Sequence, residues 1–285
     1  MKKIINTVCA MSVVIGAAMP TMSFSHEVGL QLYSLRNQME QDMSKAFNTV
    51  NSWGIKSVEG GGMLFGMPVD EYKALLSKNN MSIVSVDTNY EELRDNPMAV
   101  VYKARFYGSN FATFYWIPHG QDGQGFGIED AKKAVDVMNQ AGKVLKDNNI
   151  TLQYHAHGYE FSKYEDGTIF DFMVKNTTEA QFQMDVFWIN QAGESPSKLL
   201  KKHEGRFTSL HLKDRRKGTK PSDNGMADVE SNVVLGKGDV DIAGAVAEAK
   251  RQGIRYFFIE DESSRVIEQV PQSLEYVKSL DKHDH

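Results

Sequence analysis

The chain has 285 residues and carries more acidic than basic side chains, 37 Asp and Glu against 32 Lys and Arg, so its formal net charge is −5. Proteins that bind duplex nucleic acid neutralise phosphates with Lys and Arg, and this balance therefore disfavours nucleic acid as a partner. The single cysteine, Cys9, lies close to the N-terminus.

The first 25 residues have the three parts of a secretory signal peptide. Lys2 and Lys3 precede an apolar run, and Ser23 and Ser25 are small residues placed for cleavage before His26. The apolar run is shorter than the ~20 residues that span a bilayer, which disfavours a membrane anchor. We therefore expect a secreted protein, periplasmic in a Gram-negative bacterium, with no membrane association after cleavage.

The mature chain, residues 26–285, has a length at which an α/β barrel commonly forms one domain, and we expect a single catalytic domain. Without Cys9 it contains no cysteine, so it has neither disulfides nor thiolate ligands. Any metal ion would have to be held by His, Asp and Glu.

Short apolar runs alternate with amphipathic helical stretches in chain order. The predicted strands are 28–33, a run ending at 59, 81–86, 111–116, 150–155, 182–186, 207–212 and 255–260, and the predicted helices are 43–53, 69–78, 98–107, 128–148, 169–175, 195–203, 242–251 and 270–280. This alternation predicts a parallel sheet with helical crossovers, and eight units favour a closed (β/α)8 TIM barrel. An open doubly wound sheet is the alternative, although no G-x-G-x-x-G follows the first strand.

Polar residues stand at or just after the C-terminal ends of the predicted strands, where a barrel of this kind has its active site. They are Gln31, Glu59, Asp87, His155, His157, Asp185, His211, Lys213 and Glu260. Charged residues are rarely buried unless they are paired or bind a metal, and oxygen ligands with imidazole suit Mn, Mg, Co or Zn. The long polar connector 213–240 follows a strand, so we expect it at the same face, with only Lys213 of its basic residues pointing into the barrel.

Several segments together resemble the sugar phosphate isomerase/epimerase-like family of the xylose isomerase-like TIM barrel superfamily. They are Gly29–Arg36, the Y-H-x-H-x-x-E-F run of Tyr154–Phe161, Gln183–Trp188, the H-x-K-D of His211–Asp214, the L-G-x-G-x-x-D of Leu235–Asp241, and Phe258–Asp261. Endonuclease IV-like DNA repair enzymes share the superfamily, but the expected secretion and the negative net charge disfavour a DNA repair function.

The resemblance implies one divalent metal ion held by two Glu, one Asp and one His. Asp185, His211 and Glu260 match three of these positions. The fourth ligand is either Glu160, which keeps the charge of the family site and which we favour, or His155, which stands where other members have Glu.

The remaining candidates are expected to contact substrate. One of His155 and His157 would act as general base, or both would only hydrogen-bond sugar hydroxyls, and Lys213 would stabilise negative charge on oxygen. Predicted substrate contacts are Gln31, Glu59, Trp116 and Trp188. Asp87 departs from the His that many relatives have, which leaves its role open.

Family members move protons next to a carbonyl or carry out related eliminations. The sequence therefore predicts a metal-dependent isomerase, epimerase or lyase acting on a non-phosphorylated sugar or a 3-keto-glycoside, because phosphorylated sugars are scarce outside the cytoplasm. The alternative is a catalytically silent, secreted sugar-binding barrel. The partner would be a small carbohydrate, and a homo-oligomer is left open.

Overall fold

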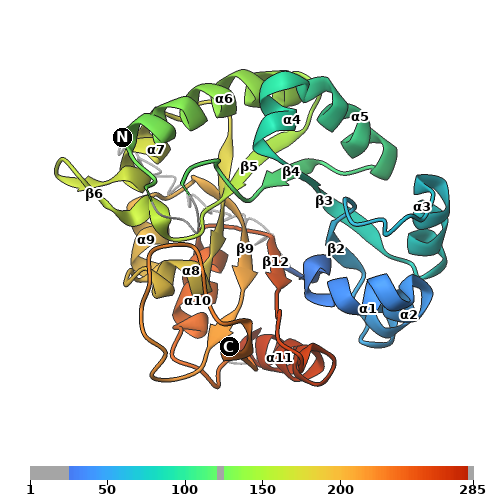
Figure 1. Cartoon of the computed structure of the whole chain (residues 1–285). Coiled ribbons are helices and arrows are strands. Elements are labelled where there is room, and N and C mark those ends of the chain that lie inside the picture. The colour runs from blue at the N-terminus through green and yellow to red at the C-terminus, as the bar shows by residue number, and fades with distance from the viewer. Residues whose placement is uncertain (1–25, 121–124, 282–285) are drawn as a thin grey trace, which may run out of the picture.

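The computed structural model describes residues 26–120 and 125–281, and the predicted signal peptide lies outside these residues. Within the described chain, eight parallel strands form a closed barrel in the order β1-β12-β9-β8-β5-β4-β3-β2 (Figure 1). These strands are β1 (Glu27–Gln31), β2 (Ser57–Gly60), β3 (Ser82–Thr88), β4 (Phe111–Phe114), β5 (Thr151–His155), β8 (Gln181–Asp185), β9 (Phe207–Leu212) and β12 (Tyr256–Ile259). The predicted barrel is confirmed, and the open sheet is excluded because β1 pairs with β12.

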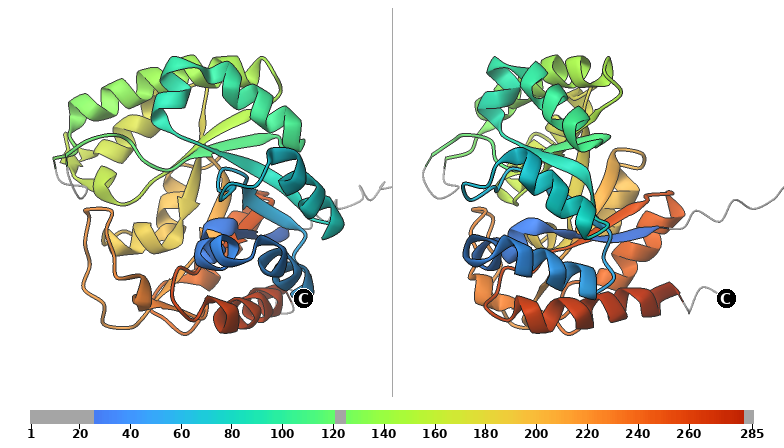
Figure 2. Two further views of the ribbon diagram at one scale, coloured as in Figure 1. Left: turned by 45° about the vertical axis from the view of Figure 1, so that its right-hand side comes forward. Right: turned by 90° about the vertical axis from the view of Figure 1, so that its right-hand side faces the viewer.

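Helices form a ring outside the strands (Figure 2). They are α1 (Arg36–Gln41), α2 (Met43–Ser52), α3 (Val69–Lys78), α4 (Tyr90–Asp95), α5 (Pro97–Tyr107), α6 (Ile128–Lys146), α7 (Ile169–Asn176), α8 (Val186–Gln191), α9 (Pro196–Lys202), α10 (Ile242–Arg251) and α11 (Val266–Leu280). Among the described residues, none of these helices has the length and apolarity needed to span a membrane.

The alternation of side chains along strands such as β5 separates an apolar outer layer from a polar inner one. On β5, Leu152 and Tyr154 belong to the apolar core, whereas Gln153 and His155 make polar contacts with neighbouring strands. Apolar residues of α6 recur at helical spacing and are buried in the same core, among them Ala131, Ala134, Met138, Ala141 and Leu145. Burial of this outer layer between strands and helices holds the barrel together.

A hydrogen-bonded network of polar side chains fills the middle of the barrel. Thr113 donates to Glu59 at 2.7 Å, Gln183 donates to Glu59 at 3.0 and 3.1 Å, and Ser209 donates to Gln153 at 3.0 Å. Gln153 in turn donates to Thr113 at 2.7 Å. A buried polar group is costly only when it lacks a partner, and these groups are paired with one another. The network therefore holds its side chains in fixed positions beneath the strand ends.

Element boundaries differ from the prediction at a few places. The first strand ends at Gln31, because the chain turns there into a 3-10 helix (Leu32–Leu35) in which the Tyr33 amide donates to the Gln31 side chain. The fourth strand likewise ends at Phe114 rather than at 116. Helix α8 begins directly after Asp185, whose carboxylate caps it, and α11 begins at Val266 rather than at 270.

The long connector after β9 lies at the C-terminal ends of the strands, as expected. Within it, β10 (Asp214–Arg215) pairs with β11 (Asn232–Val233), and a 3-10 turn (Val229–Ser231) precedes β11. A second small hairpin, β6 (Lys163–Tyr164) with β7 (Gly167–Thr168), precedes α7. The connector thus forms part of the wall around the barrel mouth.

Candidate metal centre and active site

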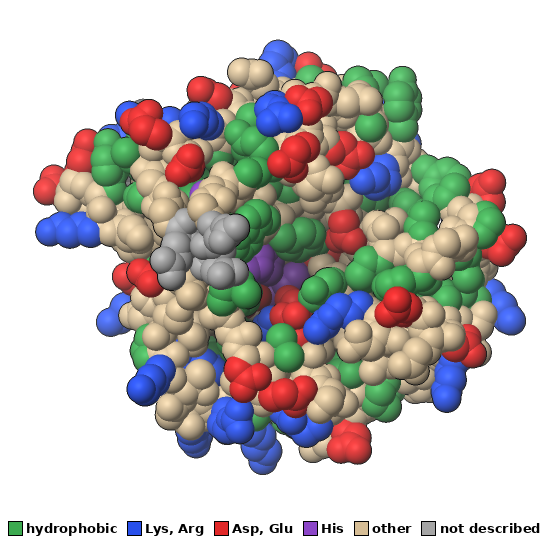
Figure 3. All heavy atoms as spheres, viewed as in Figure 1, with side chains coloured by type: hydrophobic (Ala, Val, Ile, Leu, Met, Phe, Trp, Pro, Cys, Tyr) green, Lys and Arg blue, Asp and Glu red, His purple; other side chains and the backbone are tan. Residues whose placement is uncertain are grey.

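A cavity of about 580 Å³ opens at the C-terminal ends of the strands. The described residues that line it are Gln31, Tyr33, Gly62, Met63, Asp87, Tyr115, Trp116, His155, His157, Trp188, His211, Gly225, Met226, Ala227, Val229, Glu260 and Glu262. Figure 3 shows the histidine side chains at the bottom of a hollow near the centre of this face. Its volume is that of a site for a small molecule.

His155 lies at the end of β5, and only one of its two ring nitrogens has a hydrogen-bond partner. Gln183 uses its amide nitrogen to donate to Glu59 and Ser209, so its carbonyl oxygen accepts from Nδ1 of His155 at 2.8 Å. Nε2 of His155 therefore carries the lone pair. This buried atom has no hydrogen-bond partner and lies 3.4 Å from Oδ2 of Asp185.

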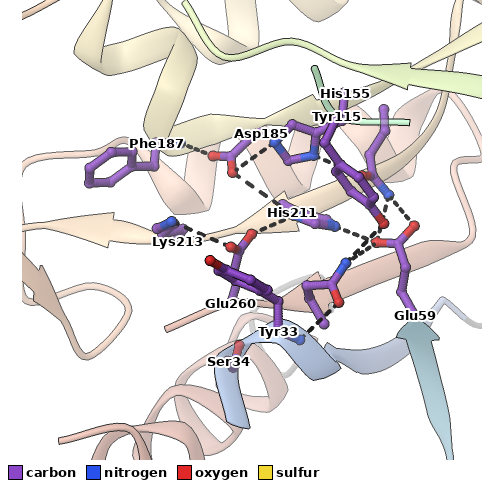
Figure 4. A network of polar contacts seen from close by, with 12 residues as sticks. Tyr33, Ser34, Glu59, Tyr115, His155, Asp185, Phe187, His211, Lys213 and Glu260 are labelled. Atoms are coloured by element: carbon purple, nitrogen blue, oxygen red, sulfur yellow. Dashed lines mark hydrogen bonds and ion pairs between the residues drawn. The ribbon is translucent and has the colours of Figure 1, made fainter. Parts of the chain in front are cut away.

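Asp185 and His211 direct their ligand atoms to the same point (Figure 4). Oδ1 of Asp185 accepts the amides of Phe187 and Trp188, whereas its Oδ2 is buried without a hydrogen-bond partner. Nδ1 of His211 lies 3.9 Å from that Oδ2. His155, Asp185 and His211 offer ligand atoms within 4.8 Å of one another, an arrangement that fits a divalent cation.

His211 lies between two carboxylates. Its Nε2 bonds Glu59, and its Nδ1 lies 2.7 Å from Glu260. Burial alone would lower the pKa of His211, but the charges and hydrogen bonds of Glu59 and Glu260 outweigh it and raise this pKa to about 10. Burial likewise opposes ionisation of Glu59, yet His211 holds its pKa below the usual value. The excess of negative charge around this imidazole favours a bound cation, and a carboxylate on the far nitrogen is typical of a metal-bound histidine.

Glu160 is not brought into this cluster. Gly158 has a φ of +101°, and after this turn the Glu160 carboxylate folds back onto its own loop. There it accepts the amides of His157 at 3.1 Å and Gly158 at 2.8 Å and the hydroxyl of Tyr154. The position expected for Glu160 next to Asp185 and His211 is instead taken by His155.

His157 and Lys213 occupy different surroundings. His157 lines the cavity, and burial lowers its pKa well below the ordinary value, so its imidazole is neutral. Lys213 does not line the cavity but lies behind it, over the rings of Phe187 and Trp188. Its ammonium contacts Glu262 and lies 3.5 Å from Glu260, so it orients these carboxylates.

Burial opposes ionisation of both Glu260 and Lys213, but their mutual attraction outweighs it. The charges of Lys213 and His211 hold the pKa of Glu260 well below its usual range, and the charges of Glu260 and Glu262 raise the pKa of Lys213. Glu260 is therefore ionised at the edge of the cluster.

The predicted substrate contacts divide into two groups. Gln31, Trp116 and Trp188 line the cavity, and Trp116 is 37% exposed at its mouth, stacked on His119 with ring centroids 4.8 Å apart. Glu59 is fully buried below the cavity and belongs to the interior network.

Sequence reasoning missed several residues of the site. Gln183 stands two residues before Asp185, and the alternation of strand side chains would have placed both on the same face. Tyr115 and Glu262 line the cavity beyond the ends of β4 and β12. Arg215 is buried against Asp239 and Gln191 rather than exposed on a basic face.

Solved structures with the same fold are numerous. A sugar phosphate isomerase/epimerase from Parabacteroides distasonis ATCC 8503 is 22% identical, with a TM-score of 0.70 over 92% of this chain and 98% of that one. D-psicose 3-epimerase with D-tagatose from Clostridium cellulolyticum H10 is 13% identical, with a TM-score of 0.66 over 89% and 99%. The IolI protein with a bound zinc atom is 11% identical, with a TM-score of 0.65 over 90% and 96%. At these identities the likeness shows the fold alone.

No protein of curated function matches the sequence of this chain. The model of the xylose isomerase-like TIM barrel family matches residues 47–281, which is most of the chain. That match spans all the barrel strands except β1 and includes every member of the histidine and carboxylate cluster. The chain therefore belongs to the xylose isomerase-like TIM barrel family.

Proposed function

We propose that this protein is a divalent-metal-dependent enzyme that moves a proton at a carbon next to a carbonyl group of a non-phosphorylated sugar or 3-keto-glycoside. The observation that carries the proposal is the convergence of His155, Asp185 and His211, with two of their ligand atoms buried and unpartnered. Glu260, which contacts His211, is the fourth candidate ligand. Structural neighbours that are named as isomerases or epimerases support the same class of reaction.

A divalent ion held by these side chains would stabilise negative charge on substrate oxygens. Hydrogen bonds within the chain orient the ligand side chains for such an ion. Gln183 and Glu59 fix the rings of His155 and His211, and the amides at the start of α8 fix Asp185. Lys213 orients Glu260 from behind.

The charge of the cavity supports a non-phosphorylated substrate. No Lys or Arg is among the lining residues in the described ranges, whereas Asp87, Glu260 and Glu262 are. A phosphate group would meet carboxylates there without a cationic partner, because Lys213 is already paired with Glu260 and Glu262. The exposed ring of Trp116 at the mouth instead offers an apolar surface for a sugar ring. Secretion, which the N-terminal sequence predicts, agrees with such a substrate.

Metal analysis of purified variants tests the site. We expect the wild type to bind one divalent ion and Asp185→Asn and His155→Leu to lose it with the fold retained by circular dichroism. Glu160→Gln is the matched control, because that carboxylate is equally buried but bonded to its own loop. Loss of metal from Glu160→Gln with retention in His155→Leu would reverse the ligand assignment.

Activity is tested by exchange of substrate hydrogen with solvent deuterium, followed by NMR. The substrates are D-fructose, D-tagatose, D-psicose and methyl 3-keto-β-D-glucopyranoside. Metal-dependent exchange or elimination with any of them is expected. A metal-loaded protein that binds these compounds without any reaction would instead be the silent sugar-binding barrel.

A further inference from the structure

Asp87 is a cavity-lining carboxylate that the metal cluster does not use. It extends from β3 into the cavity, where Tyr115 donates to its Oδ1 at 2.9 Å and the amide of Gly62 approaches its Oδ2 at 3.4 Å. In the strand order of the barrel, β3 lies diametrically opposite β9, which carries His211. Asp87 and the metal cluster therefore face the same cavity from opposite walls.

The other carboxylates that line the cavity, Glu260 and Glu262, form ion pairs with cationic side chains. Glu260 contacts His211 and Lys213, and Glu262 contacts Lys213 and lies 3.6 Å from Arg36. Among the described residues, no Lys, Arg or His side chain forms an ion pair with Asp87. A carboxylate that is paired with a buried cation is a poor proton acceptor, so Asp87 is the better base of this set.

Tyr115 joins Asp87 to the cluster. Its hydroxyl accepts from Gln31 at 3.0 Å and donates to Asp87, while its ring lies 5.3 Å from the His155 ring and 6.5 Å from the His211 ring. Because the Gln31 amide nitrogen is itself a donor, the hydroxyl proton is directed to Asp87 rather than to Gln31. Tyr115 thereby fixes the direction of the Asp87 carboxylate.

The electrostatic surroundings agree with a group that exchanges protons near neutral pH. Burial raises the pKa of Asp87 to about 6 and the negative charge of Glu59 adds to this, while the bonds from Tyr115 and Gly62 act in the opposite direction. The titratable groups that influence Asp87 from the surrounding elements are Glu59, Tyr72, Lys103, Tyr107 and Tyr115. General catalysis is most effective when the pKa lies near the working pH.

We propose that Asp87 is the general base of the reaction, positioned by Tyr115, and that it acts on the substrate from the wall opposite the metal cluster. This inference rests on the proposed function. The Asp87 carboxylate accepts the proton from the carbon next to the carbonyl, the C–H electron pair forms a carbon–carbon double bond, and the carbonyl π electrons move to its oxygen.

A second proton transfer then completes the reaction. In an isomerisation or epimerisation, the protonated Asp87 returns a proton to carbon, or solvent does so and Asp87 releases its own proton to solvent. In an elimination from a 3-keto-glycoside, the oxygen electrons re-form the carbonyl at C3, the carbon–carbon π pair moves to form a double bond between C2 and C1, the bond from C1 to the glycosidic oxygen breaks, and the proton of Asp87 passes to that leaving oxygen. Each route leaves Asp87 ionised again when the proton has been delivered.

The test compares Asp87→Asn and Tyr115→Phe with Glu92→Gln. Glu92 is a matched control because its carboxylate lies just beyond β3, bonded to Thr88 and Lys103 outside the cavity. Solvent deuterium exchange and kcat are measured from pH 5 to 9 with the four compounds named above, together with metal content. Asp87→Asn should lower exchange ~100- to 10,000-fold with metal content unchanged, and Glu92→Gln should match the wild type.

The pH profile separates catalysis from a structural role. Exchange by the wild type should rise with pH through a value near the Asp87 pKa of about 6. Since the bond from Tyr115 lowers that pKa, Tyr115→Phe should move the rise to higher pH. This readout also serves if Asp87→Asn fails to fold.

The remaining outcomes contradict either the proposed function or the role of Asp87 alone. Absence of both exchange and elimination by the metal-loaded wild type refutes the proposed function and the role of Asp87 with it. Wild-type exchange that persists in Asp87→Asn, or a Tyr115→Phe profile that does not move, overturns the role of Asp87 alone. Loss of metal from Asp87→Asn also overturns it, because Asp87 would then support the cluster.

Discussion

The Asp214 carboxylate accepts hydrogen bonds from four backbone amides of the connector that borders the cavity. Replacement of Asp214 by Asn tests how much these bonds stabilise the protein. Its Oδ1 accepts the amides of Arg215 at 2.7 Å and Val240 at 3.2 Å, and its Oδ2 accepts those of Gly236 and Gly238, both at 2.9 Å. The loop approaches so closely that a Cβ atom on Gly238 would lie 2.1 Å from Asp214 Oδ1.

Asparagine has nearly the same shape but only one acceptor oxygen. Two of the four backbone amides would then face an NH2 group, and each lost bond to a charged acceptor contributes about 1.5–3 kcal/mol. Burial raises the pKa of Asp214, so the ionised carboxylate has a desolvation cost that Asn does not. We therefore expect a net destabilisation of about 2–4 kcal/mol. For a protein of this size, that corresponds to a decrease in Tm of about 5–15 °C.

Differential scanning calorimetry measures the decrease, and hydrogen exchange should show faster exchange of the Gly236 and Gly238 amides. Asp223→Asn is the control, because Asp223 is exposed on the same connector. A Tm for Asp214→Asn equal to that of Asp223→Asn would refute the reasoning, since it would mean that the four hydrogen bonds contribute no net stability.

Three further predictions concern other parts of the molecule. Gln183→Leu removes the acceptor that orients His155, so metal affinity measured by calorimetric titration should fall about 10- to 100-fold with the fold retained. Asp171 has a pKa below its ordinary value of 3.8, because hydrogen bonds, first of all from Lys202, outweigh the effect of burial. The stability that Asp171 adds over Asp171→Asn should therefore be complete above that ordinary value and disappear as the pH falls through the lower folded-state value, as followed by thermal melts. N-terminal sequencing of the protein from its native host should find a start close to His26.

Each of these has a result that would count against it. Unchanged metal affinity in Gln183→Leu would show that His155 needs no orienting partner. A constant stability difference between wild type and Asp171→Asn down to pH 3 would mean that the charge of Asp171 is not what stabilises. Intact Met1 on the native protein would exclude cleavage of the N-terminal segment.

The barrel could be predicted from sequence because its signals are local and repeated. The spacing of apolar residues in α6, for example, specifies both the helix and its buried face before any contact is known. Strand ends such as Asp185 and His211 could also be placed together, since parallel strands in a barrel deliver their C-terminal residues to one face.

The choice between Glu160 and His155 could not be made in the same way. It depends on the direction of a side chain in a loop, where Gly158 reverses the chain and the nearby amides attract the Glu160 carboxylate. The burial of Arg215 could not be predicted from the sequence either, because its partner Asp239 lies far along the connector. Such contacts depend on tertiary structure and leave no periodic signal in the sequence.

The pairing of β1 with β12 has a consequence for how the chain folds. Glu27 to Leu30 are in register with Tyr256 to Ile259, so the barrel closes by a contact between the two ends of the described chain. Contacts of such long sequence separation carry a large loop-closure entropy and slow folding. Until the last strand has been synthesised, β1 keeps an unpaired edge that is open to pairing with other chains. Closure is therefore a late step, and the time spent before it is when this protein is most exposed to aggregation.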